Sequence, residues 1–131
     1  MAHPNEQQLR DGYAAFQRGD LDALRNQFLA EDMVWHAGGN NQLSGDYRGV
    51  DEVLGLFGKN MELSGGTFRV EVHDVLANDG HAVVLGHVTA DREGKRLDQN
   101  YVHVSHLRDG KLTESWIHNV DEAANDEFWG Q

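Results

Sequence analysis

Apolar residues in the first half of the chain recur at the spacing of one face of an α-helix. Three such stripes can be followed: Leu9, Tyr13 and Phe16; Leu21, Leu24 and Phe28; and Val50, Val53, Leu54, Phe57 and Met61. Gly19 ends the first stripe, Asp20 is well placed to cap the second, and Gly49 precedes the third. The pattern therefore predicts three helices in the N-terminal half.

Between the second and third stripes, the sequence predicts a short strand and then a loop. Residues 33–36, Met-Val-Trp-His, form an apolar run that Glu31 and Asp32 separate from the helical pattern. Residues 37–48 are rich in glycine and asparagine. We therefore expect an ordered loop over 37–48 rather than a further helix or strand.

After residues 64–66, Ser-Gly-Gly, the apolar period changes from that of a helix to that of a strand. Phe68, Val70 and Val72 alternate with polar residues, as in a strand with one buried face. Three turn motifs then separate four long strands: residues 78–80, 92–95 and 108–111. Residues 122–129 are predicted to form a short C-terminal helix.

This order of elements predicts the α+β class, with one domain over residues 1–131. A strongly curved antiparallel sheet would wrap against the three N-terminal helices. Three helices cannot cover one whole face of such a sheet, so we expect a cavity between the sheet and the helices.

Composition narrows the functions that this domain could have. The formal net charge is −11 and the basic residues are scattered, which argues against nucleic acid as a partner. No apolar run approaches the 18 to 20 or so residues of a membrane span, and residues 1–6 do not resemble a secretory signal. Without cysteine the chain has no disulfide or thiolate chemistry. We expect a cytoplasmic protein with no membrane partner.

Four motifs resemble the SnoaL-like branch of the nuclear transport factor 2-like superfamily. They are Gly19-Asp20-Leu21-Asp22, Val34-Trp35-His36, Tyr47-Arg48-Gly49 and residues 109–116, Asp-Gly-Lys-Leu-Thr-Glu-Ser-Trp. The superfamily includes ketosteroid isomerases, limonene epoxide hydrolases and SnoaL-type polyketide cyclases. The resemblance implies a cone-shaped fold with a small hydrophobic ligand, but the same scaffold serves several reactions and plain binding.

The resemblance also suggests roles for individual positions. His36 stands where ketosteroid isomerases place their aspartate general base, and His103 where they keep the protonated acid of the oxyanion hole. Their catalytic tyrosine corresponds to Gly12, so Tyr13 lies one residue away and is expected to face differently. Ile117 takes the position of an epoxide hydrolase carboxylate. The resemblance thus argues against both steroid isomerisation and epoxide hydrolysis.

The catalytic hypothesis uses two imidazoles and one phenol. His36 would abstract a proton, and His103 with Tyr101 would stabilise the resulting enolate, since unperturbed imidazoles titrate near neutral pH. The alternative is structural: His36 would bond to its own loop, and His103 and Tyr101 would satisfy polar positions within the sheet. The sequence leaves both open.

The remaining candidates line the expected cavity or cover the opposite face of the sheet. The predicted substrate pocket consists of Tyr13, Phe16, Trp35, Phe57, Ser105, Ile117, Asn119, Phe128 and Trp129. Trp116 and His118 would point to the outer face, where an exposed tryptophan favours a homodimer interface. A bulge in the last strand would reverse this assignment of faces.

The sequence predicts neither a metal nor a cofactor. The chain contains eight histidines, but no helical histidine pair, and His103 and His106 lie on opposite faces of a strand. We therefore expect cofactor-independent acid–base catalysis, of isomerase or cyclase type, on a small hydrophobic carbonyl compound. The alternative is a non-catalytic binding or accessory module with the same hydrophobic cavity.

Overall fold

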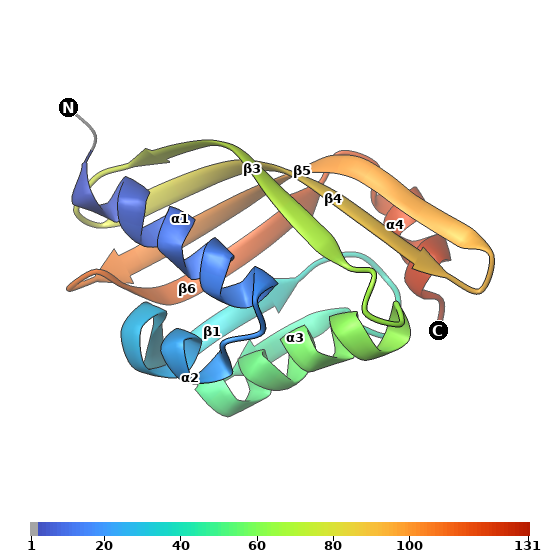
Figure 1. Cartoon of the computed structure of the whole chain (residues 1–131), viewed down its shortest axis with the longest axis horizontal. Helices are drawn as coiled ribbons and strands as arrows, with labels where there is room; N and C mark the ends of the chain where they lie inside the picture. Colours follow the sequence, from blue (N-terminus) through green and yellow to red (C-terminus); the bar gives the residue numbers. More distant parts are fainter. Residues whose placement is uncertain (1–2) are drawn as a thin grey trace.

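The computed structural model describes residues 3–131 as helices covering one face of a curved sheet (Figure 1). Its elements are α1 (Pro4–Gln17), α2 (Leu21–Ala23), the π-helical turn η1 (Leu24–Phe28), β1 (Leu29–Ala37), β2 (Gly45–Arg48), α3 (Val50–Leu63), β3 (Arg69–Ala77), β4 (His81–Arg92), β5 (Lys95–Arg108), β6 (Lys111–Asn119) and α4 (Glu122–Trp129). The predicted α+β cone is confirmed.

The six strands form one sheet in the order β2-β1-β6-β5-β4-β3. Neighbouring strands are antiparallel except β1 and β6, which run parallel, so the expectation of a purely antiparallel sheet is wrong at this one pair. Helices α1 and α3 lie across the inner face of the sheet, and α4 lies at one end (Figure 1). Among residues 3–131, no helix is long and apolar enough to span a membrane.

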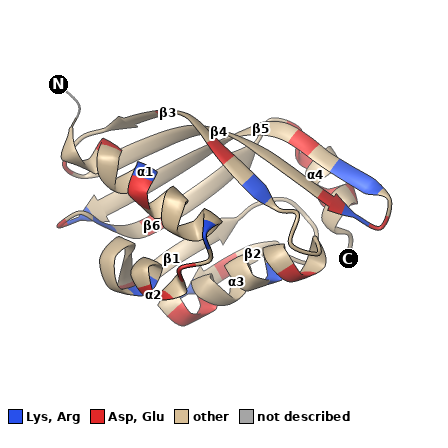
Figure 2. Ribbon diagram, in the orientation of Figure 1, with Lys and Arg blue, Asp and Glu red and all other residues tan. Residues whose placement is uncertain are grey.

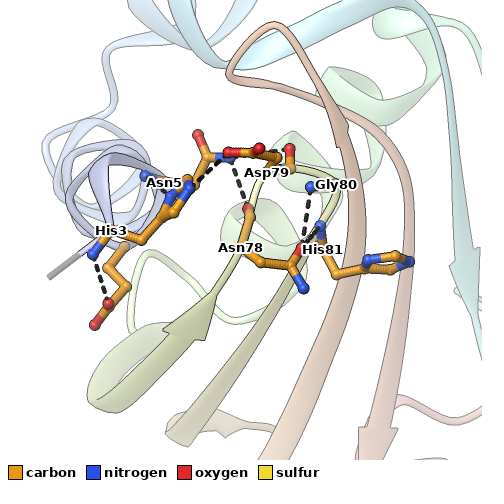
Figure 3. Close-up of polar contacts among 7 residues, drawn as sticks. His3, Asn5, Asn78, Asp79, Gly80 and His81 are labelled. Carbon is orange, nitrogen blue, oxygen red and sulfur yellow. Dashed lines mark hydrogen bonds and ion pairs between the residues drawn. The ribbon is translucent and has the colours of Figure 1, made fainter.

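Helix α1 is fixed to the sheet at both of its ends. At its start, the Asn5 side chain donates hydrogen bonds to the backbone carbonyls of Asn78 and Asp79, at 3.0 and 3.2 Å (Figure 3). At its other end, the Gln17 side-chain oxygen accepts a bond from the Val70 backbone N–H at 2.6 Å. These contacts hold the inward face of α1 at a set position against the sheet.

The predicted second helix is shorter and differently wound. Asp20 caps it as expected, accepting a bond from the Ala23 N–H at 3.0 Å. The chain then continues as the π-helical turn η1, whose wider winding changes which side chains face inward. Leu24 and Phe28 are buried, but Leu21 is 46 % exposed, so its predicted place on the buried side is wrong.

The first strand is longer than predicted, and the expected loop contains a second strand. Strand β1 spans Leu29–Ala37 rather than residues 33–36 because it pairs with both β2 and β6. Its pairing with β6 shifts register between Leu29 and Val34. Glu31 and Asp32 lie exposed in that irregular stretch, which is why they broke the apolar pattern.

A bulge in β6 decides which of its residues face the helices. Leu107 on β5 pairs with Leu112, whereas His106 pairs with Glu114, so Thr113 is an extra residue. Beyond the bulge, Ser115 is fully buried and Ile117 contacts the core, while Glu114 and Trp116 lie on the outer face.

Candidate functional site

An aromatic cavity of about 170 Å³ lies between the inner face of the sheet and the helices. Its aromatic lining comprises Tyr13, Phe16, Phe28, Trp35, Phe57, Phe68, Tyr101 and Trp129. The rings of Phe16 and Trp35 both meet that of Phe57 edge to face, with centroids 5.3 and 5.0 Å apart. Such a cavity suits a flat apolar molecule.

The cavity carries no charged side chain among the described residues, although the chain as a whole is strongly acidic. Its polar lining consists of amides, phenols and one imidazole: Gln8, Asn41, Asn60, Asn119, Asn125, Tyr13, Tyr101 and His103. Lysine, arginine, aspartate and glutamate lie instead on helices, turns and strand positions outside the cavity lining (Figure 2). A charged ligand would lose its hydration here without meeting an opposite charge.

His103 lies at the centre of the polar group in the cavity. It projects inward from β5, is 2 % exposed, and its ring lies 4.9 Å from that of Trp35. Its Nδ1 lies 2.9 Å from the Tyr13 hydroxyl, and its Nε2 lies 2.9 Å from the Ser105 hydroxyl. Burial lowers the pKa of His103 to about 3, so the ring is neutral at physiological pH.

Two tyrosines of the cavity lining are hydrogen-bonded to His103 and to each other. The Tyr101 hydroxyl donates to that of Tyr13 at 3.1 Å, so Tyr13 is left to donate its own proton to Nδ1 of His103. A neutral imidazole that accepts at Nδ1 carries its proton on Nε2. Burial raises the pKa of Tyr101 to about 12 and that of Tyr13 well above its usual value, so both phenols keep their protons.

Two buried serines continue the network into the sheet. Ser105 and Ser115 are both fully enclosed, and their hydroxyl oxygens lie 2.8 Å apart. Ser105 therefore contacts both Nε2 of His103 and the hydroxyl of Ser115. The five groups form one chain of hydrogen bonds, Tyr101–Tyr13–His103–Ser105–Ser115, which we name the inner chain.

A glycine on the neighbouring strand makes room for Tyr101. Gly86 is its direct partner in the β4–β5 register, and a Cβ on Gly86 would overlap the Tyr101 ring. The phenol can therefore lie flat across β4 only because residue 86 has no side chain. A glycine within an otherwise apolar strand was the sequence signal for this close approach.

The prediction that His36 faces the cavity is wrong. His36 lies on the outer face of the sheet, with Nδ1 2.7 Å from Asp46 Oδ1 and Nε2 2.7 Å from Glu114 Oε2. Trp35 occupies the inward position of β1, and alternation along a strand turns the next residue outward. The hydrogen bond to Glu114, together with that to Asp46, raises the pKa of His36 although partial burial opposes the shift.

Tyr13 faces the cavity, in agreement with its predicted place in the substrate pocket, although its offset of one residue from the catalytic tyrosine of the isomerases had suggested another direction. The position assigned to a catalytic tyrosine, Gly12, lies instead against Phe28, 3.4 Å from where a Cβ would stand. One residue along an α-helix turns a side chain by about 100°, and the position of α1 directs Tyr13 toward His103. A phenol is thus present in the site.

The other predicted pocket residues divide into two groups. Phe16, Trp35, Phe57, Ile117, Asn119 and Trp129 line the cavity together with Tyr13. Ser105 and Phe128 do not, so their predicted place in the lining is wrong. Ser105 lies behind His103, and Phe128 is buried on the far side of α4, where its carbonyl accepts a bond from Arg92 at 3.2 Å. The main aromatic residues that sequence reasoning missed are Phe28 and Phe68, since η1 and the start of β3 gave no signal of facing a cavity.

The outer face carries a second group of rings, which we name the outer stripe. It crosses four strands through His36, Trp116, His106 and His81, with consecutive ring centroids 5.1 to 5.2 Å apart. In the part of the chain that the structure describes, no three histidine or carboxylate side chains are placed to hold a metal ion.

Comparison with known proteins places the chain in a family. Residues 9–115 match the model of the SnoaL-like domain. A protein of Mycobacterium tuberculosis (strain ATCC 25618 / H37Rv), described as uncharacterised, is 36 % identical over 122 residues, which cover 92 % of each chain.

Solved structures with this fold include several similar chains. Bal32a, from a soil-derived mobile gene cassette, is 35 % identical, with a TM-score of 0.91 over 95 % of each chain. A protein of unknown function with a cystatin-like fold, from Xanthomonas campestris, is 30 % identical, with a TM-score of 0.89 over 100 % of each chain. A putative SnoaL-like polyketide cyclase from Jannaschia sp. CCS1 shares the fold at 16 % identity, with a TM-score of 0.73 over 100 % of this chain and 98 % of the cyclase. The chain belongs to the SnoaL-like domain family and has the nuclear transport factor 2-like fold.

Proposed function

We propose that the protein binds a small hydrophobic carbonyl compound and performs cofactor-independent acid–base chemistry on it, of cyclase or isomerase type. The observation that carries the proposal is the inner chain, which brings a buried phenol–phenol–imidazole group into an uncharged aromatic cavity. Family membership and the fold shared with a putative polyketide cyclase support a small-molecule ligand.

Tyr101 is the group that would act on the carbonyl oxygen. Tyr101 lines the cavity and is one end of the inner chain, and a phenol that keeps its proton can donate to a developing enolate. Tyr13 and His103 hold this phenol in place from behind. Hydrogen bonds of this kind act strongly in a dry site because no water competes for the donor.

The substrate must have an acidic C–H bond, because His103 is the one imidazole that lines the cavity within residues 3–131. Burial makes this ring a weak base, and both of its nitrogens already have partners. A carbon between or beside activating groups, as in a polyketide, is acidic enough to lose its proton to a water molecule or hydroxide ion, and Tyr101 would stabilise the enolate that forms. This favours the cyclase type over the steroid isomerase type.

Hydrogen–deuterium exchange of β-tetralone tests the proposal, since this flat, uncharged ketone has an activated C–H bond. In D₂O, the protein should accelerate exchange beside the carbonyl by on the order of 10²-fold over buffer. Tyr101→Phe should remove about nine-tenths of that acceleration, a loss of one hydrogen bond. His36→Gln, on the outer face, is the matched control and should leave the rate unchanged.

The second candidate is a binding or accessory module without chemistry, and it is favoured by the complete satisfaction of both His103 nitrogens. Trp35 and Trp129 line the cavity, so their fluorescence reports occupancy directly. Quenching by β-tetralone without any acceleration of exchange would support this candidate against catalysis.

We also propose that the outer stripe takes part in a homodimer interface, as the partly exposed ring of Trp116 between two histidines suggests. Light scattering after gel filtration should give the mass of two chains, and Trp116→Glu should reduce it to that of one. A single-chain mass for the unaltered protein would contradict the proposal.

A further inference from the structure

We infer that the inner chain reverses its direction of hydrogen bonding when a carbonyl ligand binds, and that Ser105 and Ser115 are positioning residues which permit the reversal. The inference rests on the proposed function, because it concerns how the same cavity recognises its ligand. It adds a specificity rule: an uncharged hydrogen-bond acceptor is selected over a donor and over an anion.

In the free protein, each group of the inner chain donates toward the interior of the sheet. Tyr101 donates to Tyr13, which leaves Tyr13 to donate to Nδ1 of His103. Nε2 of His103 then donates to Ser105, which donates onward to Ser115. In this direction the Tyr101 proton is already used, so the cavity meets only the oxygen of this phenol, which is an acceptor.

The same groups can be connected in the opposite direction with the same number of protons. Ser115 donates to Ser105, Ser105 to Nε2 of His103, and Nδ1 to Tyr13, which donates to Tyr101. The Tyr101 proton is then free to point into the cavity at a ligand oxygen. His103 differs between the two directions only in its tautomer, with the proton on Nδ1 rather than Nε2.

The serines are suited to this exchange because a hydroxyl both donates and accepts and can rotate. The hydroxyls of Ser105 and Ser115 lie 2.8 Å apart, and either can be the donor. An amide or a carboxylate at either place would hold the chain in one direction. Both serines are fully enclosed, so no bulk water competes for their bonds.

Reversal keeps every buried polar group paired, which is why it is favoured over simply breaking a bond. A buried donor or acceptor left alone costs about 1 to 3 kcal/mol, so turning Tyr101 away from Tyr13 without reversal would be expensive. A donor ligand such as a phenol needs no reversal, because it can donate to the Tyr101 oxygen. An anion would meet no cation in the described lining.

Nitrogen NMR of the full chain reads the direction directly, because the ¹⁵N shifts of a neutral imidazole identify which nitrogen carries the proton. We would record His103 in the free protein and with three naphthalene probes: β-acetonaphthone, β-naphthol and β-naphthoate. The expected result is Nε2–H in the free protein and with β-naphthol, and Nδ1–H with β-acetonaphthone. β-Naphthoate should bind at least about tenfold more weakly than the ketone, since its desolvation is not compensated.

Ser115→Ala provides a second, ligand-free test. Without Ser115, the Ser105 proton is left with Nε2 of His103 as its acceptor in the inner chain, so the Nδ1–H tautomer should already be present in the free variant. The ratio of its affinities for β-acetonaphthone and β-naphthol should be about threefold higher in Ser115→Ala than in the natural protein, because the variant needs no reversal to bind the ketone. Ser64→Ala, which removes another buried serine at the end of α3, is the matched control and should leave the tautomer unchanged.

The outcomes separate this inference from the proposed function. A ketone that binds while His103 keeps the Nε2–H tautomer would overturn the reversal and leave carbonyl binding intact. If His103 changes to the Nδ1–H tautomer with the ketone but the protein does not accelerate exchange of β-tetralone over buffer, the catalytic proposal alone is overturned. If none of the probes quenches Trp35 and Trp129, both are overturned. The wild-type spectra decide the matter even if Ser115→Ala does not fold.

Discussion

The two faces of the sheet each hold a histidine at the centre of a hydrogen-bond network, and the two rings behave in opposite ways. His103 on the inner face has neutral hydroxyl partners, and its burial lowers its pKa to about 3. His36 on the outer face lies between the carboxylates of Asp46 and Glu114, which raise its pKa. The surroundings, and not the residue type, decide whether the pKa of an imidazole here is lowered or raised.

The two histidines also change the stability of the protein with pH in opposite directions. The unfolded chain protonates His103 below its ordinary pKa of about 6.5, whereas the native state does not until about pH 3. Its contribution is therefore present above pH 6.5 or so and is lost as the pH falls. His36 gains its stabilising charge when protonated, so its contribution is present below that pKa and is lost as the pH rises through the raised value.

The largest expected effect comes from removing the titration of the inner histidine. His103→Gln should lower the unfolding free energy at neutral pH. On acidification, the unfolding free energy of the variant should fall less than that of the natural protein, because glutamine has no ring that the unfolded chain could protonate. Between about pH 6.5 and 4, the unfolding free energy of the natural protein should fall by several kcal/mol more than that of the variant. Urea unfolding at half-unit intervals measures this, and parallel curves would show that His103 is not responsible.

A steric change on the inner face should be the next largest. Gly86→Ala places a methyl group against the Tyr101 ring and should cost about 1 to 3 kcal/mol, with loss of ketone binding. Gly58→Ala, in α3 with open space around it, is the control and should be neutral or stabilising by up to about 1 kcal/mol. Thermal unfolding compares them, and equal effects would contradict the close approach.

Removing one hydroxyl from the inner chain should cost less than the steric change but more than an equivalent change outside it. Tyr13→Phe leaves buried Nδ1 of His103 without its donor, at about 1 to 2 kcal/mol of unfolding free energy. Tyr47→Phe removes a half-buried hydroxyl that donates to the Leu43 carbonyl and should cost less than about 1 kcal/mol. A larger loss at Tyr47 would reverse the ranking of the two sites.

The smallest effect is expected on the outer face. His36→Gln removes a ring between two partly exposed carboxylates, and such ion pairs contribute no more than about 1 kcal/mol. The loss should be seen at pH 6 or so and disappear toward pH 9, which chemical unfolding at the two pH values can resolve. A constant loss across this range would mean that charge plays no part.

How far the sequence predicts this molecule depends on how local each feature is. The first and third helix stripes, the Asn78-Asp79-Gly80 turn and the C-terminal helix follow from nearby residues, and each is found where expected. The extent of β1 and the existence of β2 depend on pairing with distant strands, which no local pattern records. The order of elements predicted the cavity, and resemblance to a family supplied the cone shape.

The site was harder to predict because it depends on which way single side chains point. His103 and Tyr101 were chosen correctly as inward residues of β5, where alternation is regular. His36 was misplaced because it was expected to face inward together with its neighbour Trp35, which alternation along a strand does not allow. Tyr13 was placed in the pocket, but its contact with His103 was not foreseen. The hydrogen bond between Ser105 and Ser115 was not foreseen.

The parallel pairing of β1 with β6 has a consequence for how the chain reaches this structure. Leu29 pairs with Leu112, so the central part of the sheet closes only after most of the polypeptide has been made. Contacts of such long sequence separation slow folding, since loop closure must precede the gain from pairing. On the ribosome, the hairpins β3–β4 and β4–β5 would therefore form first. The cavity would be completed only when β6 has emerged and paired with β1.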